Sequence, residues 1–225
     1  WAHQGGFNKL MARLADPATR RDIERDMRNT GLTHDGVLSH VKRDEDQGLI
    51  GRRLSDIAAD KGQTMEELVC DLMLHNVLEV GFMQPELNSD LGNQIERDIM
   101  QLVQRPDYMI GSDRIAVGRH VHPRSFGSFP KFLRLRREHN FMPLEALIQR
   151  MTANPARRFG LWDRGLLEVG KAADIVVFDP DTIHERASYD RPQQLAEGVR
   201  YVLVNGEIAF AHGRALQVMA GRALP

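Results

Sequence analysis

The chain has 225 residues, of which 42% are hydrophobic and 27% are charged, a balance typical of soluble globular proteins. Its formal net charge is −1, so no excess of positive charge predicts nucleic acid or an anionic membrane surface as a partner. No apolar run approaches the roughly 18 residues that a membrane span needs, and a single cysteine, Cys70, excludes an internal disulfide. We therefore expect a cytoplasmic protein of one large domain or two ordinary ones.

The first half of the chain is predicted to be mostly helical. Asp16 followed by Pro17 is typical of a helix start. Thr64 and Glu67 have the spacing of a capping box, which predicts a long helix that continues to Leu78. The other elements predicted here are a strand at residues 37–41, a helix at 54–61 and an amphipathic helix at 93–104.

A short apolar run at residues 108–113 predicts a buried strand that ends at Asp113, just before a long loop. Helices are predicted to follow at 126–139, with a basic face, and at 144–151. Alternation of strands and helices favours an α/β fold with parallel strands. Only two or three such β/α units are present, too few to close an eight-stranded barrel.

The last part of the chain has a different, β-rich pattern. The β-branched run at 174–179 predicts one strand, and Asn205-Gly206 between two apolar runs is a strong hairpin signal. The runs that flank this turn are 199–204 and 207–211. We therefore predict two domains, residues 1–162 with the β/α units and residues 163–225 as a small β domain.

Asp113 is the first candidate for chemistry. A carboxylate at the carboxyl end of a strand can bind a metal, act as a general base, or cap the loop that follows. One carboxylate cannot make a zinc site, because catalytic zinc takes three protein ligands. His120 and His122 have the spacing of a chelating pair, but they lie in a loop with arginines beside it, which opposes a divalent cation.

Three further residues are candidates for substrate binding. The rigid guanidinium of Arg124 can hold an anionic substrate end, or it can brace the loop through a salt bridge with Asp113. Ser112 offers a hydroxyl beside Asp113, and His122 precedes Arg124 by two residues. No pattern of a nucleophilic serine accompanies them.

These residues together resemble a known family. Gly111-Ser112-Asp113, His122-Pro123-Arg124 and Gly127-Ser128-Phe129-Pro130 resemble the C-terminal half of the N-acyl-D-amino-acid deacylases, or D-aminoacylases, of the amidohydrolase superfamily. Further matching stretches are 151–157 with 160–161, 165–167 with 170–177, and 202–206. A departure is Arg114, which stands where the family usually has a small residue or glycine.

The resemblance implies the C-terminal part of a distorted (β/α)8 barrel, followed by part of a small β-sandwich. It also implies a zinc-dependent hydrolase of N-acyl-D-amino acids, in which zinc polarises the acyl carbonyl and activates a water. Asp113 matches the acid/base that moves the proton of the water to the leaving amine, and it is a possible additional metal ligand. Arg124 matches the residue that holds the α-carboxylate of the substrate, with Ser112 and His122 beside it.

The family's metal-binding histidines belong to earlier strands that this chain does not contain. We therefore expect a missing N-terminal segment, or a partner chain, to supply the main zinc ligands, and we expect the 225 residues to be inactive alone. The alternatives are an inactive remnant with a structural role and a different amidohydrolase, such as one that opens cyclic amides.

Overall fold

The computed structural model describes residues 1–30, 35–84, 89–114, 120–189 and 191–224. The chain divides into two compact units. One comprises Trp1–Leu87 and Ile115–His122, and the other comprises Asn88–Arg114 and Pro123–Pro225. Within the described part, no helix is both long and apolar enough to cross a membrane.

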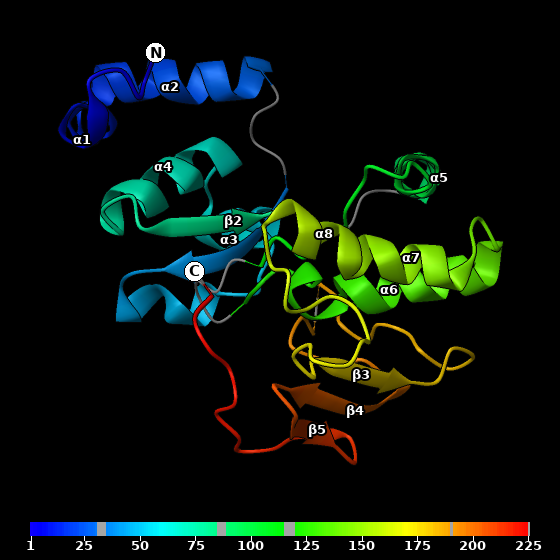
Figure 1. Cartoon of the computed structure of the whole chain (residues 1–225). Coiled ribbons are helices and arrows are strands. Elements are labelled where there is room, and N and C mark those ends of the chain that lie inside the picture. Colours follow the sequence, from blue (N-terminus) through cyan, green and yellow to red (C-terminus); the bar gives the residue numbers. More distant parts are fainter. Residues whose placement is uncertain (31–34, 85–88, 115–119, 190, 225) are drawn as a thin grey trace. The chain divides into compact units, whose positions relative to one another are not determined.

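The first unit is a set of helices around a two-stranded antiparallel sheet (Figure 1). Leu38 and Val41 of the sheet pack with Ile57, Leu68 and Leu72 of two helices, and all five side chains are buried. In chain order the elements are α1 (Gly6–Ala15), α2 (Pro17–Thr30), β1 (Val37–Val41), η1 (Asp44–Leu49), α3 (Leu54–Lys61), α4 (Met65–His75) and β2 (Val80–Met83).

Local sequence signals explain most of these boundaries. The backbone N–H of Thr19 donates to Asp16 Oδ2 over 2.8 Å, so Asp16 caps α2 as predicted. The predicted capping box of α4 is confirmed, because the Glu67 N–H donates to Thr64 Oγ1 and the Thr64 N–H donates to Glu67 Oε2. The helix ends at His75, short of the predicted Leu78, because the next turn departs from helical geometry and reaches φ 62° at Leu78.

The second unit combines helices with a four-stranded antiparallel sheet of order β3-β4-β5-β6 (Figure 1). Leu133 and Leu147 from the helices and Ile183 from the loop after β3 form its buried core. The elements are α5 (Ser89–Val103), α6 (Arg124–His139), α7 (Leu144–Met151), α8 (Ala153–Arg158), β3 (Ile175–Phe178), β4 (Val199–Val204), β5 (Glu207–Ala211) and β6 (Arg214–Ala215).

The predicted hairpin is confirmed at the turn between β4 and β5. Val204 pairs with Glu207, and the two residues between them have positive φ, 48° at Asn205 and 87° at Gly206. Two consecutive left-handed residues make the tight turn whose twist matches an antiparallel pair. Asn and Gly are the residues that adopt this backbone at least cost.

Two predictions about strands were wrong. Residues 108–113 form no strand, and the Ile110 N–H donates to the carbonyl of Arg150 over 3.0 Å rather than to a neighbouring strand. The described sheets are antiparallel, not parallel, and the described residues form no barrel. Apolar patterning indicates that a segment is buried, but it does not identify the segment beside it. The fold is therefore mixed α/β with a small antiparallel sheet, and the domain boundary at 162 stays a prediction.

Candidate active site

Asp113 lies in the irregular segment that follows α5. Its backbone is left-handed, with φ 45°, a conformation that aspartate tolerates better than most residues. Its side chain is 77% exposed. The carboxylate is therefore presented to solvent on a sharply turned backbone, and not from the end of a strand as the sequence predicted.

Arg124, the first residue of α6, contacts Asp113 twice. Its Nη2 lies 2.9 Å from Asp113 Oδ2, and its Nε donates to the backbone carbonyl of Asp113 over 3.0 Å. One guanidinium thus holds both the side chain and the main chain of Asp113, although the two residues are 11 positions apart. The structure brings these two predicted residues together. Because the Asp113 carboxylate is mostly exposed, the ion pair itself contributes only about 0 to 1 kcal/mol to stability.

The other two predicted residues are Ser112 and His122. Ser112 is half-buried and directly precedes Asp113. His122 is also half-buried, and it belongs to the first compact unit. The second unit therefore contains Ser112, Asp113 and Arg124 of the predicted site. The roles predicted for all four residues stay predictions.

A second arginine, Arg114, directly follows Asp113 in the chain, and no role was predicted for it. The Arg114 guanidinium carbon is 5.6 Å from the ring centroid of Phe126, a cation–π arrangement. Phe126 lies on the first turn of α6, two residues after Arg124. Arg114 is itself exposed. The signal that could have drawn attention to it was its departure from the family pattern.

The described residues do not form a zinc site. No group of three or more His, Cys, Asp or Glu side chains among them is arranged to hold a metal ion. A catalytic zinc takes three protein ligands, and Asp113 with Arg124 bound to it offers one carboxylate at most. The donor set within the described part of the chain therefore does not fit this metal.

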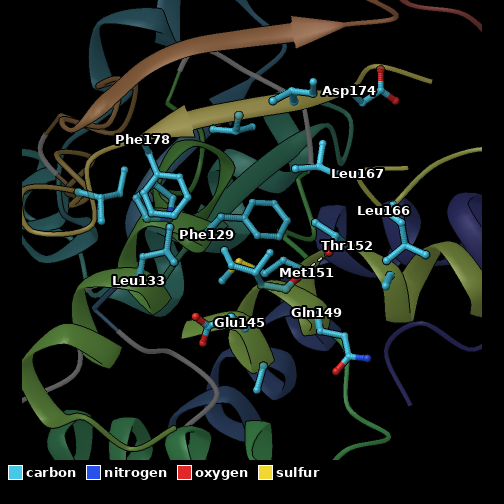
Figure 2. Close-up of a pocket in the computed structure, with 18 of the residues that line it drawn as sticks. Phe129, Leu133, Glu145, Gln149, Met151, Thr152, Leu166, Leu167, Asp174 and Phe178 are labelled. Atoms are coloured by element: carbon cyan, nitrogen blue, oxygen red, sulfur yellow. Dashed lines mark hydrogen bonds between the residues drawn. The ribbon is translucent and has the colours of Figure 1, made fainter. Parts of the chain in front are cut away.

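A separate cavity of about 950 Å³ lies in the second unit, among α6, α7 and β3 (Figure 2). Figure 2 shows Leu133 and Phe178 close together, with Leu166 on the opposite side. None of the four predicted site residues lines it. Its lining is mainly aliphatic and aromatic, whereas recognition of an anionic amino-acid derivative needs convergent polar groups. The candidate site is therefore the Asp113 region and not this cavity.

Comparison with known proteins decides the family. The chain matches the amidohydrolase family model over residues 9–210. The chain belongs to the amidohydrolase family. Over 116 residues, 51% of the chain, it is 47% identical to an N-acyl-D-glutamate deacylase of Alcaligenes xylosoxydans xylosoxydans. The resemblance to N-acyl-D-amino-acid deacylases is thereby confirmed.

Two solved structures are similar to this amidohydrolase chain. A D-aminoacylase crystal structure superposes with a TM-score of 0.68 at 31% identity and covers 83% of the chain. The N-acyl-D-glutamate deacylase of Bordetella bronchiseptica, complexed with zinc and a phosphonate inhibitor, gives a TM-score of 0.65 at 34% identity and covers 84%. The chain spans 24% of the length of the Alcaligenes relative and 37% and 38% of the two solved chains.

Proposed function

We propose that this chain is the C-terminal part of a zinc-dependent hydrolase that removes the acyl group from N-acyl-D-amino acids, built on the last β/α units of a distorted barrel and part of a β-sandwich. The observation that carries the proposal is the contact between Asp113 and Arg124 in a chain that is 47% identical to an N-acyl-D-glutamate deacylase over half its length. A carboxylate and a guanidinium are the groups that such a reaction needs for proton transfer and for binding the carboxylate of the substrate.

In the proposed reaction, water adds to the acyl carbon and the C–N bond of the amide breaks. Asp113 accepts a proton from the attacking water and returns it to the departing amine, so the products are a carboxylate and a free D-amino acid. The 77% exposed side chain of Asp113 is accessible to both water and substrate. Ser112 is proposed to contact the bound substrate.

Arg124 is proposed to bind the α-carboxylate of the substrate. In the structure its Nη2 is occupied by Asp113 Oδ2 at 2.9 Å. An incoming carboxylate competes for the same guanidinium and can replace Asp113 as its partner. Substrate binding at Arg124 would thus release Asp113 for proton transfer at the moment when it is needed.

The zinc ligands are proposed to come from outside these residues. The described residues do not fit the metal, and the chain spans well under half the length of its solved relatives. A preceding segment of the same polypeptide, or a partner chain, would complete the ligand set. The 225 residues by themselves are then expected to bind no stoichiometric zinc, which metal analysis of the isolated chain measures.

The test is hydrolysis of N-acetyl-D-glutamate by the complete gene product with zinc, with the L enantiomer as the comparison substrate. Asp113→Asn removes the acid/base and should lower kcat by about 100-fold or more. Asp107→Asn is a matched control, because Asp107 also pairs with a nearby arginine, Arg105, at 3.1 Å. It should leave kcat within a few-fold of the unsubstituted enzyme. If Asp113→Asn is equally mild, Asp113 is not the acid/base.

A further inference from the structure

Two arginines in the second unit, Arg105 and Arg114, lie against aromatic rings, and they differ in whether a carboxylate pairs with them. The Arg105 guanidinium carbon lies 5.4 Å from the ring centroid of Tyr108, and its charge is matched by Asp107 through hydrogen bonds of 3.2 and 3.1 Å. Arg114 lies at a similar distance, 5.6 Å, from Phe126. Unlike Arg105, it forms no salt bridge with any carboxylate in the described parts of the chain. Arg114 is therefore an exposed cation that is held against an aromatic ring, and no carboxylate in the described parts of the chain neutralises its charge.

The position of Arg114 in the chain associates this charge with the candidate site. It directly follows Asp113, whose carboxylate is already paired with Arg124 at 2.9 Å. The ring against which Arg114 packs belongs to the same first turn of α6 as Arg124. Within the described part of the chain, Asp113 thus supplies one negative charge, and Arg114 and Arg124 supply two positive charges. A substrate with a single carboxylate would engage one of the two guanidinium groups.

We infer that Arg114 binds a second carboxylate of the substrate, so that the site is specific for N-acyl derivatives of acidic D-amino acids. This inference rests on the proposed function. Arg124 would hold the α-carboxylate, and Arg114 would hold the carboxylate of the side chain. A guanidinium presents a planar fork that matches a carboxylate in two parallel hydrogen bonds. Packing on Phe126 restricts the Arg114 side chain before substrate arrives, which lowers the entropic cost of binding.

The experiment compares two substrates of similar length, N-acetyl-D-glutamate and N-acetyl-D-methionine, in the complete gene product with zinc. Arg114→Met should lower kcat/KM for the glutamate derivative by about 10- to 100-fold, because a charge-assisted hydrogen-bonded pair is lost. It should change kcat/KM for the methionine derivative by less than about threefold, since no charge is lost there. Arg105→Met is the matched control, because it removes an equally stacked arginine whose charge is already neutralised. The control should leave the ratio of the two values unchanged.

Several outcomes overturn the inference. Equal losses for both substrates in Arg114→Met would assign Arg114 to the shared α-carboxylate or to folding. Unchanged kcat/KM values for both substrates would remove Arg114 from substrate recognition altogether. Arg114→Lys, which keeps the charge but not the fork, should retain more activity on the glutamate derivative than Arg114→Met, and circular dichroism should be the same for all variants.

A direct binding measurement separates this inference from the proposed function. If the gene product hydrolyses neither compound, the proposed function fails. Calorimetric titration with N-acetyl-D-glutamate and N-acetyl-D-methionine then decides the inference independently. Selective loss of glutamate-derivative binding in Arg114→Met supports it, and equal binding by the variant, or no binding of either compound, overturns it.

Discussion

Replacement of Gly198 by alanine is the most demanding test of the packing in the second unit. Gly198 directly precedes β4 and has φ 83°, in the left-handed region. A Cβ atom there would lie 2.5 Å from Ile183 Cα and 2.6 Å from Ile183 N, distances that real Cβ contacts do not reach. Both are backbone atoms, so no side-chain rotation can relieve the contact. Ile183 is itself 1% exposed and belongs to the core.

The expected cost has two parts. A left-handed backbone at a residue with a Cβ costs about 1 to 2 kcal/mol. Forcing a methyl group into a packed backbone contact adds about 1 to 3 kcal/mol. Gly198→Ala should therefore lower the free energy of unfolding by about 2 to 5 kcal/mol, a large share of the roughly 5 to 15 kcal/mol available to a folded domain.

Gly170→Ala isolates the first part of this cost. Gly170 has φ 90°, and no atom lies within 4 Å of the position that its Cβ would take. Urea unfolding of the chain, followed by circular dichroism and extrapolated to water, measures both variants. Gly170→Ala should lose about 1 to 2 kcal/mol and Gly198→Ala clearly more. Equal losses in the two variants would refute the argument that close approach to Ile183 requires glycine at 198.

Two further predictions concern the first unit. Thr64→Ala removes the cap of α4 and should lower the free energy of unfolding by about 1 kcal/mol in the same urea experiment, whereas Thr30→Ala, at the exposed end of α2, should have almost no effect. A cap that contributes nothing would give equal values for the two variants. Burial raises the pKa of the Cys70 thiol to about 11, so at pH 8 its reaction with a disulfide reagent should be about 100-fold slower in the folded chain than in urea. Similar rates in the two states would mean that Cys70 is accessible and not buried.

Features of the fold that depend on residues close together in the sequence could be predicted, whereas features that depend on distant residues could not. The α4 cap joins Thr64 to Glu67, three residues apart, and the β4–β5 turn requires only Asn205 and Gly206. Both were predicted because their hydrogen bonds and backbone angles are local. The strand predicted at residues 108–113 was wrong because a strand requires hydrogen bonds to a neighbouring strand. No pattern within six residues specifies that neighbour.

The candidate site was predictable in its members but not in its arrangement. The sequence selected Asp113 and Arg124, and it left open whether Arg124 binds substrate or braces the loop. The structure shows the two residues in contact, because Arg124 forms an ion pair with the carboxylate of Asp113 and a hydrogen bond to its backbone carbonyl. The packing of Arg114 on Phe126 depends on where α6 begins and on how the chain returns to it. Neither follows from residue spacing.

The left-handed backbone at Asp113 limits which residues this position can accept. Asparagine and glycine enter this region at little cost, whereas a β-branched residue there would be a genuine outlier. Asp113→Asn therefore changes the charge and leaves the turn intact, which makes it a cleaner chemical probe than valine or threonine. The same restriction acts on natural variation. If Asp113 has the proposed acid/base role and a descendant lost that role but kept the fold, asparagine or glycine would be the expected replacement.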